Sequence, residues 1–382
     1  MPNLLYFAPE DRGGLADYGR EQANALQACG VNVTLLTPAI PSGEAIQVSC
    51  HRSVLGTAPN RAACPSKLSR RVKSARTILR NMNALTKEAR VGKFRHILFA
   101  GYFEYLAPLW APRLKRLAGI GVVFGSVVHD PLRDFVVGPL LWHRWSTACG
   151  YSFLRDAFVH EPIVLPTVRP QPQLRTTVIP HGPYRFSAAT VNRKLMRERL
   201  QIPQAAHVLL AFGHLRDSKN LHLALEAMQR RPEFYLLVAG RELGATQKTA
   251  AYYQQRARDL GVAARCRWDI RDIPSDEVGN LFEATDLVLL TYNAAFSSAS
   301  GVLNIACHFR KPCLASGGKS NLRTVLESYS LGYWVEPDSF LSIAAGLKRW
   351  LHERPCPDWT TYEQENSWSK NAEIVANRLF SS

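Results

Sequence analysis

The sequence lacks several features that would assign it to a common class of protein. No window approaches the about 20 consecutive apolar residues that a membrane-spanning helix needs. No Cys-x-x-Cys pair and no cysteine–histidine group has the spacing of a zinc site, so we expect no bound metal. The first turn lacks the Gly-x-Gly-x-x-Gly pattern of nicotinamide-binding folds, which argues against an oxidoreductase. The N-terminus lacks the basic segment of a secretory signal, so we predict a first strand there and a cytoplasmic location.

Acidic residues are outnumbered by basic ones. The chain has 47 Lys and Arg against 31 Asp and Glu, which gives a formal net charge of +16. A surface this basic favours anionic partners, namely nucleic acid, phospholipid headgroups or phosphorylated substrates. No recognised nucleic-acid module and no aromatic-rich basic motif accompanies the charge, so we expect no specific nucleic-acid partner.

Much of the positive charge lies in Arg61–Arg95, where Glu88 is the only acidic residue. Apolar residues recur within this segment at steps of three and four, which predicts a helix with one apolar stripe. Two interpretations of Lys67–Arg90 stay open. The helix is either solvated, with its stripe on the core, or it attaches the protein peripherally to an anionic membrane. Both hold if the stripe faces inward while the charges face lipid.

A chain of 382 residues exceeds what one hydrophobic core usually organises, so we expect two domains. In the first half, apolar runs alternate with helical patterns. We predict strands at 4–8, 31–37, 96–100, 122–128 and 177–180. Near-continuous apolar runs are typical of a parallel sheet that is covered on both faces. Right-handed crossovers between the strands then give a doubly wound sheet.

The alternation restarts after Gly182–Ala206, with strands predicted at 207–212, 234–239, 264–268 and 287–291. We therefore predict an α/β protein in which two Rossmann-like, doubly wound parallel sheets face a cleft. The predicted domains are residues 1–187 and 188–366, followed by a C-terminal helix at 367–382 that crosses back onto the first domain. Ligands of such sheets bind at the carboxyl ends of the strands.

Two strand-to-helix turns in the second half point to a bound anion. The segment Asp286–Ser316 leads from an apolar strand through a small-residue turn into a helix at Val302. Free N–H groups and the helix dipole favour an anion at such a helix N-terminus. Upstream, Phe212–Asn220 puts Arg216 and Lys219 on another strand-end turn, and the two turns together can surround a diphosphate. The alternative is that ordinary surface charges flank this turn.

The first half also offers candidate residues at strand ends. Gly13 and Gly14 let the backbone pass close to a ligand because no Cβ intervenes, although a plain strand-to-helix turn fits equally. His129 ends an apolar strand, with Asp130 placed to orient its ring, and His181 stands near the linker. A lone histidine after a strand is also often a structural hydrogen-bonding residue.

Five segments of the chain carry a resemblance to a known family. They are Gly13–Tyr18, Val128–Asp130, Ile179–Gly182, Gly213–Asn220 and Asp286–Pro312, in this order across nearly the whole length. In these segments the sequence resembles the retaining glycosyltransferases of family 4, which have the GT-B fold. Each motif alone is only moderately specific, but chance does not readily produce five motifs in the expected order.

The resemblance implies transfer of a sugar from a nucleotide-sugar donor, with no metal and no cofactor beyond that co-substrate. It implies catalytic roles for His129, Arg216 and Lys219. It implies that the donor is bound by Gly13, Gly14, Gly213, Arg216, Lys219, Ser300, Gly301 and Val302. It implies that the acceptor, a glycan or a lipid-linked sugar, is bound by Asp17, Tyr18, Asp130 and His181. Front-face retention follows, in which the leaving phosphate oxygen accepts the proton of the acceptor hydroxyl.

One departure from the family concerns two glutamates, eight positions apart, that many members carry before the final Gly-x-Pro. Alignment on Pro312 puts Ser297 and Ile305 at these positions, so neither carboxylate is present. A sub-pattern of the family with Ser-Gly-Val-Leu at this place resembles the chain better. The alternative hypothesis is a degenerate relative that binds nucleotide sugars without turning them over.

Overall fold

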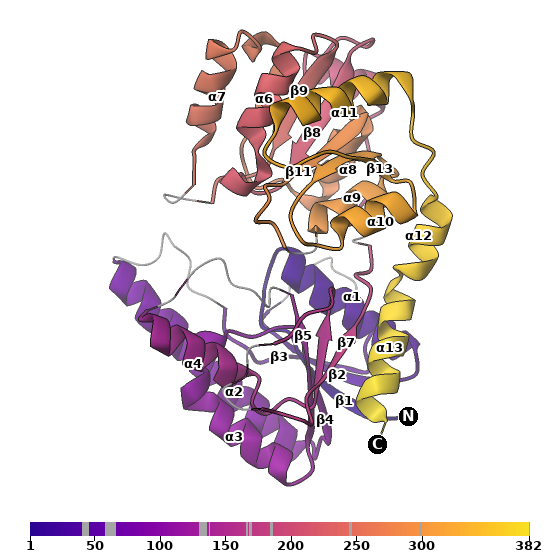
Figure 1. The fold of residues 1–382 in the computed structure, drawn as a ribbon. Coiled ribbons are helices and arrows are strands. Elements are labelled where there is room, and N and C mark those ends of the chain that lie inside the picture. Colours follow the sequence, from indigo (N-terminus) through magenta and orange to yellow (C-terminus); the bar gives the residue numbers. More distant parts are fainter. Residues whose placement is uncertain are drawn as a thin grey trace. The chain divides into compact units, whose positions relative to one another are not determined.

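The computed structural model describes residues 1–381, apart from 40–45, 58–65, 130–135, 137, 166, 168–169, 184–185, 244–246 and 298–299. The chain divides into two compact units (Figure 1). Unit 1 comprises Met1–Gly182 and Asn366–Ser382, and unit 2 comprises Pro183–Glu365. Each unit has its own sheet, and the units are described one at a time.

Unit 1 contains a seven-stranded sheet in the order β3-β2-β1-β4-β5-β6-β7. All neighbouring strands pair in parallel. The chain winds outward from β1 in one direction and from β4 in the other, so the topological switch point lies between β1 and β4. The strands are β1 (Asn3–Phe7), β2 (Asn32–Thr37), β3 (Cys50–Ser53), β4 (His96–Phe99), β5 (Val123–Val128), β6 (Asp156–Val159) and β7 (Arg175–Val178).

Helices cover both faces of this sheet. The helices α1 (Gly14–Ala28) and α13 (Trp368–Phe380) share one apolar cluster with the strands on one face. On the other face, α2 (Lys67–Val91) and α3 (Ala107–Gly119) form a second cluster, and α4 (Leu140–Gly150) packs on α3. Alternation along β1 divides its side chains between the faces, because Leu4 and Tyr6 join α1 whereas Leu5 and Phe7 join α3.

Unit 2 contains a six-stranded sheet, also parallel throughout, in the order β10-β9-β8-β11-β12-β13. Its switch point lies between β8 and β11, since the chain winds outward from these two strands in opposite directions. The strands are β8 (His207–Phe212), β9 (Phe234–Ala239), β10 (Cys266–Asp269), β11 (Leu287–Thr291), β12 (Cys313–Ser316) and β13 (Gly332–Trp334).

Helices again cover both faces of the sheet in unit 2. One face carries α6 (Leu221–Gln229), α7 (Ala250–Asp259) and α11 (Phe340–His352). The other face carries α5 (Arg193–Arg199), α8 (Ser275–Ala284), α9 (Gly301–His308) and α10 (Leu322–Ser328), with α12 (Trp359–Glu365) at its margin.

The predicted fold class is confirmed, because both units are doubly wound parallel sheets covered by helices. The strands predicted at 207–212, 234–239 and 287–291 have the predicted bounds. The sequence analysis did not predict β6, a buried strand of four residues, or β3 and β13, which are edge strands of four and three residues. An edge strand as short and as exposed as β3 carries no apolar pattern that a periodicity search can detect.

The basic helix α2 begins and ends close to the predicted bounds, but its apolar stripe is divided. Towards the C-terminus, Met82, Leu85 and Ala89 are buried in the core of unit 1. Towards the N-terminus, Leu68 and Val72 are 71% and 53% exposed. Only half of the stripe therefore serves the core. Among the described residues, no helix combines the length and the apolar character that a membrane crossing requires.

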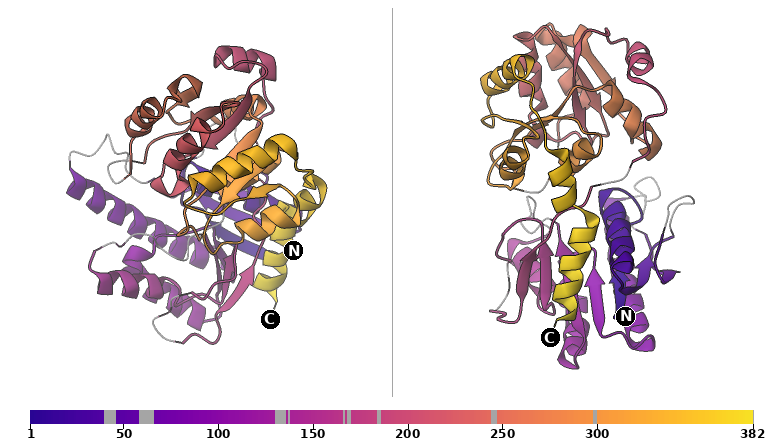
Figure 2. Two further views of the ribbon diagram at one scale, coloured as in Figure 1. Left: turned by 45° about the horizontal axis from the view of Figure 1, so that its top comes forward. Right: turned by 90° about the vertical axis from the view of Figure 1, so that its right-hand side faces the viewer.

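Helix α13 lies beside α1 in unit 1 (Figure 2), and a buried polar network fastens it there. The Tyr6 hydroxyl donates to the Gln22 side chain at 2.7 Å, and the Gln22 amide donates to Asn371 at 2.7 Å. The Asn371 amide in turn donates to the Pro180 carbonyl at 2.7 Å and to the Tyr18 hydroxyl at 3.1 Å. Asn371 and Gln22 are fully buried, so water does not replace a lost partner.

We expect Asn371→Ala to lower the free energy of unfolding by roughly 1–3 kcal/mol, because it leaves buried polar groups without a partner. The control is Lys370→Ala on the same helix, where the exposed ion pair with Glu373 should contribute less than about 0.5 kcal/mol. Urea denaturation followed by tryptophan fluorescence measures both. Equal transition midpoints for the two variants would show that the network does not stabilise unit 1.

Candidate active site

The turn after β8 lies at the switch point of the sheet in unit 2 and depends on two glycines. Gly213, the first residue after β8, has φ of +86°, in the left-handed region that favours glycine. A Cβ atom on Gly240, after β9, would lie 2.1 Å from the Gly213 carbonyl oxygen. Neither position therefore accepts a side chain, and the two turns approach each other closely at the carboxyl edge of the sheet.

This turn carries the two predicted cations, Arg216 and Lys219. The Lys219 ammonium donates a hydrogen bond to the Phe212 carbonyl oxygen at 2.5 Å, at the end of β8. Burial and the positive charge of Arg216 lower the Lys219 pKa from 10.5 to about 7. Arg216 is exposed, and no carboxylate in the described part of the chain forms an ion pair with its guanidinium.

Two further residues of this edge, His214 and Arg241, were missed in the sequence. The Arg241 guanidinium donates from Nε to Nε2 of His214 at 2.9 Å and also pairs with Asp272 at 3.3 Å. Burial and the charges of Arg241, Arg216 and Lys219 lower the His214 pKa to about 4. His214 is therefore neutral at pH 7 and accepts the hydrogen bond, while Arg241 adds a third cation. The strand-end rule that found Arg216 applies equally to Arg241, two residues after β9.

The N-terminus of α9 follows the neighbouring strand β11. Ser300 is the N-cap of α9, and its hydroxyl accepts a hydrogen bond from the Leu303 N–H at 3.3 Å. The Ser300 hydroxyl also bonds to that of Tyr292 at 2.8 Å. The Thr291 hydroxyl donates to the Lys219 carbonyl at 3.0 Å, so the turns after β8 and β11 are joined directly.

The geometry brings several predicted donor residues together. A Cβ atom on Gly213 would lie 3.4 Å from the Lys219 Nζ and 3.8 Å from Val302 at the start of α9. The cavity beneath them, lined by Gly213, Arg216 and Lys219, measures about 20 Å³. Since one water needs roughly 10–15 Å³, this cavity is too small to hold a diphosphate.

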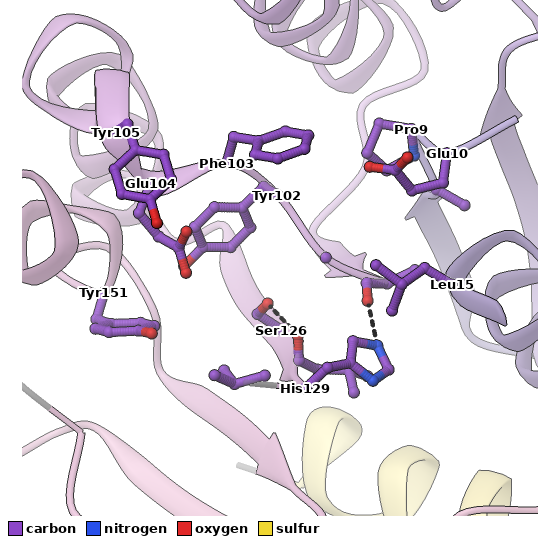
Figure 3. Close-up of a pocket in the computed structure, with 15 residues that line it drawn as sticks. Pro9, Glu10, Leu15, Tyr102, Phe103, Glu104, Tyr105, Ser126, His129 and Tyr151 are labelled. Carbon is purple, nitrogen blue, oxygen red and sulfur yellow. Dashed lines mark hydrogen bonds between the residues drawn. The ribbon is translucent and has the colours of Figure 1, made fainter. Parts of the chain in front are cut away.

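In unit 1, a larger pocket lies at the β1–β4 switch point (Figure 3). Its volume is about 110 Å³, enough for a small ring. The residues after β1 and β4 form its walls, together with the end of β5 and Tyr151. The described lining residues are Ala8, Pro9, Glu10, Leu15, Ala100, Gly101, Tyr102, Phe103, Glu104, Tyr105, Ser126, Val127, Val128, His129 and Tyr151.

His129 lines this pocket from the end of β5. Its Nε2 lies 2.9 Å from the Ala100 carbonyl oxygen, and because a carbonyl only accepts, Nε2 carries the proton (Figure 3). The His129 ring packs edge-on against Tyr18 at a centroid distance of 4.5 Å. His160 and His181 also pack against Tyr18, at 5.4 and 5.1 Å.

Both of these further histidines are neutral. Burial, followed by the charge of His129, lowers the His160 pKa to about 3. Burial, followed by the charge of His160, lowers the His181 pKa to about 3. The His181 Nδ1–H donates to the Gly182 carbonyl at 2.8 Å. His160 was missed, although it directly follows β6 as His129 follows β5.

The other residues predicted in the first half, which lie at the start of α1, do not line this pocket. Gly13 has φ of +80° and, with Gly14, lies exposed at the start of α1. Asp17 forms an ion pair with Arg20 at 3.0 Å. Tyr18 is fully buried in the network with Asn371, so an acceptor contact by its side chain stays a prediction that would require this network to open.

Asp130 lies outside the described residues. Of the two positions where the family often has glutamate, Ser297 is exposed in the turn before α9. Ile305 is buried in the core of unit 2. No group of His, Cys, Asp or Glu in the described parts of the chain has an arrangement that holds a metal ion.

Comparison with solved structures defines the class of fold as GT-B. The chain is similar to sucrose-phosphate synthase from Thermosynechococcus elongatus, with a TM-score of 0.64 and 16% identity over 100% of this chain and 95% of that one. It is similar to WaaG, a glycosyltransferase involved in lipopolysaccharide biosynthesis, with a TM-score of 0.60 and 14% identity over 99% and 100% of the chains. It is also similar to HepE from Anabaena in complex with UDP, with a TM-score of 0.60 and 14% identity over 100% and 96%.

A sequence profile described as Glycosyl transferases group 1 matches residues 192–375. This segment, which begins at α5 and ends in α13, is similar to the group 1 glycosyl transferases. No curated protein matches the sequence.

We expect the Lys219 ammonium to titrate near pH 7, and we expect Arg216→Ala to raise its pKa by removing a neighbouring positive charge. The chemical shift of the lysine Cε carbon, followed over pH in protein with labelled lysine, measures this value, and Lys219→Arg assigns the resonance. The matched control is Arg230→Ala at the C-cap of α6, which should leave the resonance unchanged. Titration of every lysine above pH 9 would contradict the burial of this ammonium.

Proposed function

We propose that the protein transfers a glycosyl group from a nucleotide-sugar donor to a hydroxyl of a glycan or lipid-linked acceptor, with retention of configuration and without a metal. The observation that carries the proposal is the meeting of Arg216, Lys219 and the α9 N-terminus at the β8–β11 switch point. Cations and free N–H groups at this edge of a sheet suit a diphosphate.

The electrostatics of Lys219 support this assignment. Its lowered pKa means that the free protein holds this ammonium in an unfavourable place, next to another cation. A bound diphosphate would bring negative charge to both side chains and raise the Lys219 pKa again. One of the three ammonium N–H groups bonds to Phe212, which leaves two to donate to phosphate oxygens.

The proposed reaction follows from this charge compensation. The bond between the anomeric carbon and the diphosphate oxygen breaks, while a bond from the acceptor oxygen forms on the same face of the sugar. The acceptor hydroxyl proton passes to the departing phosphate oxygen, so the products are a glycoside and a nucleoside diphosphate. Arg216 and Lys219 stabilise the negative charge that grows on the leaving group, which is often the largest catalytic contribution.

The acceptor is assigned to the pocket of unit 1. This pocket lies at the other switch point, it has room for a ring, and His129 lines it with its tautomer fixed by Ala100. We assign His129 to the sugar-binding wall next to the reacting hydroxyl. Contacts from Asp17, Asp130 and His181 to the acceptor belong to the same proposal.

Peripheral attachment to a membrane is proposed for the N-terminal half of α2. There Leu68 and Val72 are exposed, and Arg71, Lys73 and Arg76 lie exposed beside them. Apolar side chains that serve no core, with cations around them, are suited to the surface of an anionic bilayer. Such attachment would hold the protein close to a lipid-linked acceptor.

We expect Arg216→Ala and Lys219→Ala each to slow nucleotide release from the donor by about 10²–10³, the loss typical of one electrostatic contact to a transition state. The donor is chosen by thermal shift from UDP-, GDP-, ADP- and dTDP-sugars, because a ligand of the native state raises its stability. Since HepE, which has a similar fold, was solved with UDP-glucose, UDP-sugars come first.

The matched control for these variants is Lys348→Ala, an exposed cation on α11 whose loss should leave the rate unchanged. A nucleotide sugar that stabilises the protein but is never cleaved would contradict the transferase and support a binding module. Equal rates for Lys219→Ala and Lys348→Ala would remove Lys219 from the donor site.

We expect the protein to sediment at low salt with vesicles of equimolar phosphatidylglycerol and phosphatidylcholine. Reversing Arg70, Arg71 and Lys73 to Glu should weaken this binding by about 100-fold or more, since each cation near the surface contributes roughly 1 kcal/mol. The control reverses three exposed cations of unit 2, Lys194, Arg199 and Lys348. Equal binding by the two triple variants would remove α2 as the attachment site.

A further inference from the structure

The pocket of unit 1 is chemically unlike the donor site. None of its described lining residues is Lys or Arg, although the chain as a whole has a net charge of +16. Its walls carry instead two carboxyl groups, Glu10 and Glu104, and the rings of Tyr102, Phe103, Tyr105 and Tyr151. The two switch points of this protein therefore offer opposite environments to a ligand.

We infer that this pocket binds a neutral pyranose ring of the acceptor, with Phe103 as the surface on which the ring stacks and Glu10 as a hydrogen-bond acceptor for its hydroxyl groups. The inference rests on the proposed function and narrows the acceptor to an uncharged sugar residue. A sugar that carries phosphate at this position is excluded by it.

Phe103 is placed as a contact surface for a ligand. It lies in the segment after β4, next to Tyr102. Its side chain lines the pocket and is still 46% exposed. Its ring lies on the side of the pocket where Pro9 and Glu10 stand (Figure 3). An exposed aromatic face in a concave site gains from covering the apolar C–H face of a sugar, because both surfaces leave water.

Tyr102, the residue before Phe103 in the pocket wall, is held by several contacts. The Tyr102 hydroxyl donates to the Gly150 carbonyl at 2.5 Å, and its ring packs against Phe99 and Trp110 at centroid distances of 5.1 and 5.4 Å. A wall that does not have to reorganise binds a small ring with less loss of conformational entropy. The shape of the pocket is thus set before a ligand arrives.

Glu10 decides between a neutral and an anionic ligand. It is the third residue after β1, is half-buried, and directs its carboxyl group toward the pocket (Figure 3). Carboxyl oxygens accept hydrogen bonds, and so do phosphate oxygens, so a phosphate gains no partner here. A sugar hydroxyl donates, and it pairs with Glu10 without any cation.

The experiment measures binding in the full chain carrying Arg216→Ala, Lys219→Ala and Arg241→Ala, so that phosphate lacks the three cations of the β8–β9 edge in unit 2. Saturation-transfer NMR compares methyl glucosides, galactosides and mannosides with the matched hexose 6-phosphates. We expect at least one methyl hexoside to bind and no hexose phosphate to bind. Adding Phe103→Ala should weaken the hexoside by about ten-fold, as expected when one ring-sized apolar contact is lost.

The matched control is Leu141→Ala, an exposed apolar residue of α4 outside the pocket, which should not change binding. Because Phe103 and Leu141 are both exposed, neither variant should unfold the protein. Glu10→Lys should weaken the hexosides and admit the hexose phosphates. The inference is overturned if a hexose phosphate binds as tightly as its hexoside, or if Phe103→Ala leaves hexoside binding unchanged.

Failure of the transfer reaction is recognised separately, with the unmutated chain. If no nucleotide sugar releases its nucleotide while hexosides still bind at Phe103, the ligand class stands and the proposed reaction falls. If nucleotide release depends on Arg216 but no hexoside binds, the reaction stands and the assignment of this pocket to a neutral sugar is wrong.

Discussion

Two positive charges share the turn at the end of one strand in unit 2, and burial together with their mutual repulsion is the constraint on which the proposed donor site depends. Burial and Arg216 together hold the Lys219 pKa near 7. The charged form of Lys219 is therefore destabilised in the folded protein. The surroundings enforce this position: Gly213 and Gly240 bring two turns together, and Thr291 fixes the Lys219 backbone. An anion that contacts both cations relieves the repulsion, which makes the site selective for negative charge before any particular ligand is considered.

The same topology in unit 1 produces a site of the opposite character. In both sheets the switch point leaves a gap at the carboxyl ends of two central strands, and the turns after those strands supply the side chains. After β8 the turn supplies Arg216 and Lys219, whereas after β1 and β4 the turns supply Glu10 and Phe103. The backbone therefore decides where a ligand can bind, and a few turn residues decide its charge. Under the proposed function this separation has a use, since the carboxyl groups of the unit 1 pocket would repel a diphosphate.

How much the sequence predicts depends on how local the determining interaction is. The position of Arg216 and Lys219 on the turn after β8 was predictable because a strand end, a turn and a charge lie within one short segment. The same argument applies to Arg241 after β9. The pocket of unit 1 was not predictable in this way. Glu10 and Phe103 line one pocket only because β1 pairs with β4, and apolar periodicity does not determine the order of strands in a sheet. The burial of Tyr18 depends on Asn371, a residue 353 positions away in sequence. Interactions of this range are fixed by packing, not by local pattern.

The packing of α9 gives a physical reason for the absence of the two glutamates. Ile305 lies on the buried side of α9 with Leu303, Ala306 and Cys307, where an unpaired carboxylate would cost several kcal/mol of desolvation. The inner face of α9 is thus built as core, and its polar contribution to the site is confined to the Ser300 cap. A carboxylate near Arg216 and Lys219 would also neutralise part of their field. Under the proposed function, its absence leaves Arg216 and Lys219 free to act on the diphosphate and removes a carboxylate contact to the hydroxyl groups of the donor.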